Sequence, residues 1–254
     1  MKRNLGQNFL AAEEILEEAA QAVSLKGKTV LEIGAGHGEL TVFLAKDAKN
    51  VVALELDSKL IAPLRENLSL NEIKNVKIVC GDALEFDFSN YEIIYGNLPY
   101  YITTPLLFKI IKSGCKQAVL LVQAEVGERI VAESGSHEYS RLSVMVQSQA
   151  DASIIDFVPK ECFNPIPKVD SVLLKLVMKK NFVLGEKLVN ALFQHKNQSV
   201  KNALVHSTAF LGLDKQKARE FADSLGFGGE KVFCLSLKQL ETVCKKFNGF
   251  SEKT

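Results

Sequence analysis

The sequence predicts an α/β protein in which a doubly wound, mostly parallel sheet is followed by a small helical domain. Three observations support this fold class. Short apolar stretches alternate with amphipathic helical stretches between residues 13 and 133, which is the pattern of successive β-α-β units. Two further strand-like stretches follow with a Pro-containing loop between them, and from residue 179 onward the periodicity is helical only.

The elements of this fold can be assigned in order along the chain. A first helix is expected over residues 13–24, where apolar residues recur on one stripe. Buried parallel strands are predicted at 29–33, 51–54, 76–80, 92–95 and 118–122. Helical stretches are predicted around 40–44, 60–68, 105–113 and 125–133, and they lie between and after these strands.

Two later apolar stretches, at 154–158 and 172–177, are predicted to extend one edge of the sheet as antiparallel strands. We therefore expect a sheet-containing domain over residues 1–178 and a helical domain over residues 179–254.

Composition narrows the class of protein. Of the 254 residues, 24% are charged and 47% hydrophobic, as in an ordinary globular protein. No apolar run approaches the ~20 residues of a membrane span, and acidic residues follow the N-terminus where a signal peptide would be apolar. The five cysteines are odd in number and lack zinc-site spacing. We expect no metal, reduced thiols and a cytoplasmic monomer that does not bind membranes.

The net charge of +1 conceals an asymmetry between the two predicted domains. Residues 1–178 carry 18 Lys and Arg against 23 Asp and Glu, or −5, whereas residues 179–254 carry 13 against 7, or +6. The basic C-terminal region favours an anionic partner, although a solvated helical face has the same composition. The candidate contacts are Lys196, Lys201, Lys215, Lys217 and Arg219, with Arg129 and Arg141 nearer the predicted crevice.

The segment VLEIGAGHG (residues 30–38) ends a predicted strand and opens a helix. Gly34 and Gly36 would allow a tight turn and the close approach of a ligand. The spacing G-x-G-x-G differs from the dinucleotide fingerprint, which needs a small residue at Glu39. A tight turn that binds nothing is the alternative.

Acidic residues end the next two strands. Glu55 lies at the end of its strand and is the better candidate to accept the ribose hydroxyls of an adenosine cofactor. Asp57 could instead cap the helix that starts at Ser58. Asp82 could accept the exocyclic amine of the cofactor adenine, or it could simply form a Gly-Asp turn.

The segment YGNLPY (residues 95–100) ends the fourth strand and points to a reaction. The exocyclic nitrogen of adenine is a poor nucleophile, so a site that methylates it needs acceptors for the amino hydrogens. The Asn97 side-chain oxygen and the Leu98 carbonyl suit this role. Pro99 would stiffen the turn, and Tyr100 could stack on an extruded base. A strand-ending turn without chemistry is the alternative for this motif alone.

Together these segments resemble the KsgA family of ribosomal RNA adenine dimethyltransferases along nearly the whole chain. The matching segments are LGQNFL (5–10), LEIGAG (31–36), LELD (54–57), GNLPY (96–100), QAEVGER (123–129), RLSVM (141–145) and FNPIPKVDS (163–171). The chain length and LFQHK (192–196) look more like the archaeal and eukaryotic branch. The resemblance implies a Rossmann-like, S-adenosylmethionine-dependent enzyme. Its implied reaction is N6,N6-dimethylation of two adjacent adenosines near the 3′ end of small-subunit ribosomal RNA, within immature subunits.

The resemblance also implies roles for residues that the local pattern does not identify. Asn8 and Leu10 would contact the cofactor, alongside the glycine turn. Phe163 would stack on the second face of the target adenine, although a Phe before Asn-Pro-Ile-Pro could equally be a core residue. Tyr101 stands where bacterial members usually carry asparagine, which leaves the shape of the pocket entrance open.

Two alternatives from other classes and one related methyltransferase remain from the sequence. A nicotinamide-dependent dehydrogenase would share the glycine turn and Glu55 but would not need residues 97–100. A ribosome-assembly factor with vestigial catalysis is disfavoured only because every cofactor motif is intact. An Erm-type methyltransferase of large-subunit ribosomal RNA is the nearest related enzyme.

Overall fold

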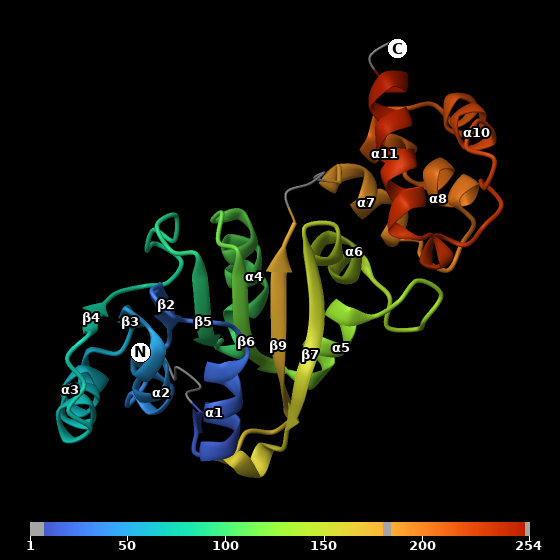
Figure 1. The fold of residues 1–254 in the computed structure, drawn as a ribbon. Helices are drawn as coiled ribbons and strands as arrows, with labels where there is room; N and C mark the ends of the chain where they lie inside the picture. Colours follow the sequence, from blue (N-terminus) through green and yellow to red (C-terminus); the bar gives the residue numbers. More distant parts are fainter. Residues whose placement is uncertain (1–7, 180–183, 252–254) are drawn as a thin grey trace. The chain divides into compact units, whose positions relative to one another are not determined.

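The computed structural model describes residues 8–179 and 184–251, and the chain forms two compact units (Figure 1). The first unit comprises Met1–Gly127 and Ala150–Lys179, and the second comprises Glu128–Gln149 and Lys180–Thr254. The division predicted between residues 178 and 179 lies one residue from a break between the units. No sequence pattern indicated that residues 128–149 belong with the C-terminal helices.

A seven-stranded sheet forms the centre of the first unit, in the order β4-β3-β2-β5-β6-β9-β7. The first five strands are parallel, β9 is antiparallel to β6, and β7 is antiparallel to β9. Every predicted strand overlaps a strand of this sheet, and the predicted antiparallel edge is confirmed. The strands are β2 (Thr29–Ile33), β3 (Asn50–Glu55), β4 (Val76–Cys80), β5 (Ile93–Asn97), β6 (Gln117–Gln123), β7 (Ala150–Val158) and β9 (Ser171–Met178).

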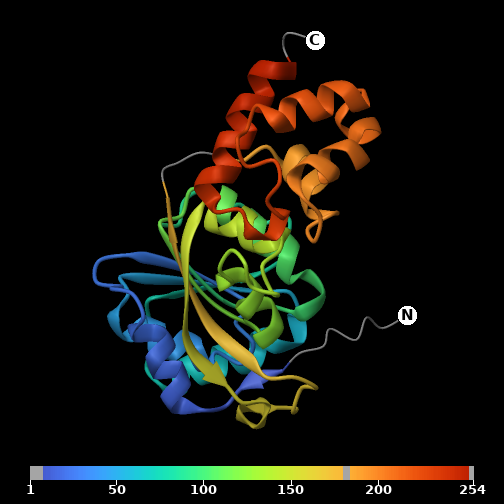
Figure 2. The same cartoon turned by 90° about the vertical axis from the view of Figure 1, so that its right-hand side faces the viewer.

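The direction of winding reverses between β2 and β5. From β2 the chain passes through α2 toward β3, and from β5 it passes through α4 toward β6 on the other side. Because such crossovers are right-handed, α2 and α4 cover opposite faces of the sheet (Figures 1 and 2). This confirms the doubly wound class. The helices of this part are α1 (Glu13–Gln21), α2 (Glu39–Asp47), α3 (Ile61–Leu70), α4 (Thr103–Lys112) and α5 (Ala124–Val131).

One face of the sheet packs on α1 and α2 through a continuous apolar cluster. Leu16 and Ala20 of α1 and Leu44 of α2 are buried against the strands in this cluster. The strands contribute alternate residues, since side chains of one strand point to opposite faces in turn. The strand members are Val30, Val51, Ile93, Tyr95, Val119, Leu121, Val158 and Leu173.

A second, two-stranded sheet joins segments that are far apart in sequence. Strand β1 (Phe9–Leu10) pairs antiparallel with β8 (Phe163–Asn164), which follows η3 (Lys160–Cys162). The pairing continues where Ala11 N donates to Cys162 O at 2.8 Å. The segment before α1 is thereby fixed beside the glycine turn.

The second unit is helical, as the sequence predicted for its C-terminal part. Tyr139 lies at its centre, 1% exposed, and its hydroxyl donates to Leu235 O at 3.1 Å. The helices are α6 (Arg141–Gln147), α7 (Glu186–Phe193), α8 (Val200–His206), α9 (Thr208–Leu211), α10 (Lys215–Asp223), η4 (Val232–Cys234) and α11 (Leu237–Ser251). Within the described ranges, no helix combines the length and hydropathy that crossing a membrane requires.

Candidate active site

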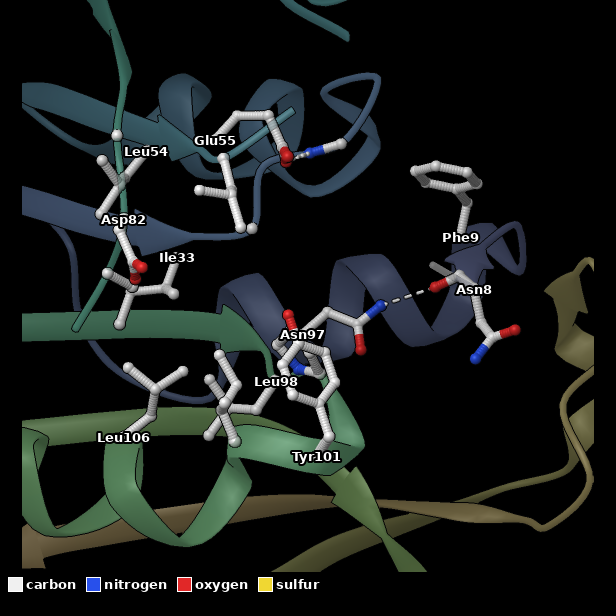
Figure 3. Close-up of a pocket in the computed structure, with 17 residues that line it drawn as sticks. Asn8, Phe9, Ile33, Leu54, Glu55, Asp82, Asn97, Leu98, Tyr101 and Leu106 are labelled. Carbon is white, nitrogen blue, oxygen red and sulfur yellow. Dashed lines mark hydrogen bonds between the residues drawn. The ribbon is translucent and has the colours of Figure 1, made fainter. Parts of the chain in front are cut away.

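A pocket of about 790 Å³ opens at the carboxyl ends of β2, β3, β4 and β5. This is where the winding reverses, which is the usual position of ligand sites in doubly wound sheets. The side chains in Figure 3 converge on it from all four strand ends. The lining residues are Asn8, Phe9, Ile33, Gly34, Gly36, Leu54, Glu55, Leu56, Gly81, Asp82, Ala83, Asn97, Leu98, Pro99, Tyr101, Ile102 and Leu106.

The glycine turn after β2 needs glycine for two physical reasons. Gly34 and Gly36 have φ values of +73° and +59°, which side chains rarely tolerate. A Cβ on Gly34 would also stand 3.2 Å from Asn97 O, and one on Gly36 would stand 3.0 Å from the Phe9 ring. The turn therefore approaches the pocket wall more closely than any other residue type would permit.

Glu55 ends β3 with its carboxylate buried in the pocket wall, and the residue is only 4% exposed. Its Oε2 accepts from Gly36 N at 2.9 Å, and its Oε1 accepts from Asp57 N at 2.8 Å. Asp57 instead accepts from Lys59 N at 3.0 Å and caps η1 (Ser58–Leu60). The structure thus separates the two acids: Glu55 lines the pocket, and Asp57 is the cap.

Asp82 lines the pocket from the loop after β4. Its Oδ1 accepts from Leu84 N at 2.8 Å, so the predicted turn is formed as well. The loop is held from α4, where Lys109 Nζ donates to Ala83 O at 2.9 Å and to Leu84 O at 2.6 Å. Asp82 is therefore placed to present a carboxylate on a fixed loop.

Asn97 ends β5, and its side-chain amide has a defined orientation. Nδ2 donates to Asn8 O at 2.9 Å. A backbone carbonyl can only accept, so the atom that faces it must be the amide nitrogen. The opposite atom, Oδ1, is then a hydrogen-bond acceptor turned away from Asn8 (Figure 3).

The residues after Asn97 form a rigid support. Leu98 is 1% exposed, and its N–H donates to Leu121 O at 3.1 Å. Pro99 precedes η2 (Tyr100–Ile102), and its carbonyl accepts from Ile102 N at 3.0 Å and from Thr103 Oγ1 at 3.1 Å. The Tyr100 side chain, predicted to stack on the base, lies outside the described part of the structure.

Leu10 and Phe163, two of the predicted site residues, do not line this pocket. They face each other across the β1–β8 pair and are 8% and 3% exposed in the core beside α1. Phe163 is thus a core residue in this structure, and its stacking on the target adenine stays a prediction. Leu10 lines a second cavity of about 530 Å³, which shares Phe9, Gly34 and Gly36 with the first.

This second cavity contains a buried acid. Glu32 is 2% exposed and accepts from Thr41 Oγ1 at 2.6 Å. Burial raises the pKa of Glu32 to about 8, and the nearby Glu39 and Glu55 carboxylates act in the same direction, while the Thr41 hydrogen bond opposes them. Among residues 8–179 and 184–251, no cluster of three His, Cys, Asp or Glu side chains is arranged to hold a metal ion.

Comparison with known proteins gives the family of the chain. Residues 1–220 match the model of the family described as ribosomal RNA adenine dimethylase. The chain belongs to this family. It is 40% identical to a probable ribosomal RNA small subunit methyltransferase A from Thermococcus gammatolerans, over 94% of this chain and 86% of that protein. The protein of the same name from Methanosphaera stadtmanae is 37% identical, over 94% of this chain and 91% of that protein.

Solved structures agree with this assignment. A dimethyladenosine transferase from Plasmodium falciparum superposes with a TM-score of 0.86 at 27% identity, over 96% of this chain and 98% of that one. The 23S rRNA methyltransferase ErmE superposes with a TM-score of 0.72 at 25% identity, over 95% and 100% of the two chains. The dimethylase is therefore an adenine methyltransferase with a Rossmann-like sheet, as the motifs predicted.

Several residues that line the pocket of this dimethylase were not predicted from the motifs. Phe9 contacts the glycine turn, and Leu56 and Tyr101 are exposed at 43% and 61% beside the pocket. Leu56 and Tyr101 directly follow predicted site residues, so their positions in the sequence could have identified them as pocket residues. The position of Leu106 in the sequence could not have identified it, because this residue reaches the pocket only through the orientation of α4.

Proposed function

We propose that this dimethylase transfers two methyl groups to N6 of each of two adjacent adenosines near the 3′ end of small-subunit ribosomal RNA. The observation that carries the proposal is the fixed amide of Asn97, whose Oδ1 is an oriented acceptor at the strand end. The relatives named small subunit methyltransferase A support the choice of subunit.

The pocket fits S-adenosylmethionine. The ribose would be held by Glu55, the adenine by Asp82 with the apolar walls of Leu54 and Leu106, and the methionine portion by the glycine turn. Gly36 supports the fit, because it has a positive φ and no side chain, so its backbone can approach a ligand directly. When bound, this cofactor supplies an electrophilic methyl group.

The contribution of the chain to the reaction is positioning and electrostatics. Asn97 Oδ1 would accept one N6–H of the target adenine and hold the nitrogen lone pair toward the methyl donor. The Leu98 carbonyl would accept the other N6–H. After the first transfer, N6 carries one methyl group and one hydrogen. Rotation about the C6–N6 bond would then present the remaining N6–H to Asn97 Oδ1 for the second transfer. Neither a metal nor a covalent intermediate with the enzyme takes part in this scheme.

The helical unit would bind the ribosomal RNA, and the partners of its basic side chains favour some of the predicted contacts over others. Lys196 Nζ donates to His137 O and Tyr139 O, and Lys201 pairs with Asp223 at 2.7 Å, so both serve the fold. Arg141 lies 3.8 Å from Glu186. The remaining candidates are Lys215, Lys217 and Arg219 of α10, together with Arg129 of α5. Lys215 and Arg219 are exposed, and Lys217 and Arg129 are half-buried.

We further propose that the protein acts as a monomer in the cytoplasm on immature small subunits. All five cysteines are free, which suits a reducing compartment. The main alternative, Erm-type methylation of large-subunit ribosomal RNA, has the ErmE superposition in its favour. The higher identity of the small-subunit relatives favours the small subunit.

The test is mass spectrometry of nuclease-digested ribosomal RNA after immature small subunits, large subunits and free adenosine are each incubated with enzyme and labelled cofactor. We expect N6,N6-dimethyladenosine at two adjacent positions in small-subunit RNA only. The Asn97→Ala variant is the matched negative control. Labelling of the large subunit alone would favour the Erm-type reaction, and absence of labelling would favour an assembly factor without catalysis.

A further inference from the structure

The short segment formed by residues 8–10, here named the strap, connects the glycine turn with the Asn97 amide. Asn8 contributes the backbone carbonyl that accepts from Asn97 Nδ2 at 2.9 Å. Phe9 and Leu10 form β1 and are paired with β8. The acceptor that orients Asn97 thus belongs to a segment 89 residues away in sequence.

The Phe9 ring fixes the strap on the glycine turn. Its centroid lies 4.2 Å from that of the His37 ring, with the rings tilted by 45°. The ring also lies close to Gly36, where a Cβ would stand 3.0 Å from Phe9 Cδ1. Phe9 therefore contacts two residues of the turn that supplies the cofactor site.

The glycine turn is itself held from two directions. Asn67 Nδ2 of α3 donates to His37 O at 2.9 Å. On the pocket side, Gly36 N donates to Glu55 Oε2 at 2.9 Å. These hydrogen bonds hold the turn in place where the Phe9 ring contacts it. Displacement of the ring would therefore move the strap and not the turn.

The position of the strap determines the orientation of the Asn97 amide, because the two ends of an Asn amide are nearly identical in shape and opposite in hydrogen bonding. Without the Asn8 carbonyl, rotation by half a turn would exchange Nδ2 and Oδ1. The amide would then present a donor to an adenine amine that is also a donor. Figure 3 shows Phe9 beside Asn8, with the Asn8 carbonyl directed at Asn97.

We propose that Phe9 and His37 are positioning residues, which hold the Asn8 carbonyl in place and through it keep Asn97 Oδ1 directed at the target amine. The role of Oδ1 rests on the proposed function, whereas the orientation of the amide can be measured without RNA. The family resemblance implies that the strap contacts the cofactor through Asn8 and Leu10. Phe9 and His37 instead link that contact to the reacting amine.

The first experiment measures the Asn97 side-chain amide by NMR in protein labelled with ¹⁵N at asparagine. Loss of its signal in Asn97→Ser identifies it. We expect slow hydrogen exchange in the wild type, at least severalfold faster exchange in Phe9→Leu and His37→Ala, and recovery in His37→Phe, which restores a ring. Phe157→Leu changes an aromatic residue that is 57% exposed and lines neither cavity, so it is the matched control.

Unchanged exchange in Phe9→Leu, or a His37→Phe variant as fast as His37→Ala, would overturn the proposal. His37 has a side chain that is 40% exposed, so its replacement should leave the fold intact. Faster exchange in Phe157→Leu as well would also overturn it, because the effect would then be general loosening.

The second experiment measures single-turnover methylation of immature small subunits at saturating cofactor. Phe9→Leu should lower the rate roughly three- to tenfold, the effect expected for one lost ring contact. In the Asn97→Ala background the same change should have no further effect, because Phe9 acts through Asn97. Losses that multiply in the double variant would overturn the proposal. A wild type that methylates no subunit would count against the proposed function alone, since the NMR experiment needs no RNA.

Discussion

Replacement of Glu55 by alanine tests the cofactor site and has two separable effects. The carboxylate is the acceptor for Gly36 N–H and Asp57 N–H, at 2.9 and 2.8 Å. A hydrogen bond to a charged group contributes roughly 1.5–3 kcal/mol. Water in the opened pocket would replace part of this, so we expect a loss of stability of about 2–4 kcal/mol, or roughly 5–15 °C in Tm for a chain of this size.

The second effect is on affinity for S-adenosylmethionine. Loss of the acceptor for two ribose hydroxyls should cost about 1.5–3 kcal/mol, which corresponds to a Kd raised roughly 10- to 150-fold. The methylation rate at saturating cofactor should change much less. Isothermal titration and thermal unfolding measure the two effects on the same sample.

Asp57→Ala is the matched control for this prediction. Asp57 lies two residues away and caps η1 through Lys59 N, so its loss should cost about 1 kcal/mol of stability and leave cofactor affinity unchanged. Unchanged affinity in Glu55→Ala would refute the ribose assignment. An equal loss of affinity in both variants would show that the loop conformation, and not the carboxylate, holds the cofactor.

Three further predictions concern the reaction, the pH dependence and the RNA. Asn97→Ala should retain the fold and bind cofactor, yet lose about a hundredfold or more in single-turnover rate; a wild-type rate would remove Asn97 from the reaction. Because the folded-state pKa of Glu32, about 8, lies above the ordinary value of 4.5, the folded chain retains a proton that the unfolded chain releases, and stability should fall as the pH rises from 4.5 to 8. Glu32→Gln should flatten this fall, by an amount on the order of a few kcal/mol in unfolding titrations, and an identical pH profile would contradict the assignment. The double variant Lys215→Glu, Lys217→Glu should bind immature subunits more weakly and reduce the slope of log affinity against log salt by about 1–2. The control variant Lys201→Met should change this slope less. Equal slopes for the wild type and the double variant in filter binding would show that α10 makes no phosphate contacts.

The parallel strands and the edge addition could be predicted because their signal is local. Buried strands such as β2 and β3 are short, mostly apolar stretches that lead directly into the residues of the site. The positions of Gly34, Glu55, Asp82 and Asn97 follow from this, since the carboxyl ends of parallel strands meet at one edge. All four line the same pocket.

The features that could not be predicted depend on contacts between distant segments. The bond between Asn8 and Asn97 depends on the pairing of β1 with β8, which no local pattern reveals. The burial of Phe163 depends on the same pairing, and the stacking role that the resemblance implies for it stays a prediction. Helix α6 was missed because seven residues rich in β-branched and polar types give a weak helical signal.

The path of the chain through the two units limits how the protein can be divided. Residues 128–149 belong to the helical unit, yet the chain returns afterwards to add β7 and β9 to the sheet. A chain cut after residue 179 would keep the buried Tyr139 ring but lose Leu235, the acceptor of its hydroxyl, and Phe193, whose ring lies 5.8 Å away. During synthesis, likewise, every strand of the sheet is available once residue 178 has emerged, while residues 128–149 must wait for the last helices before they can be buried.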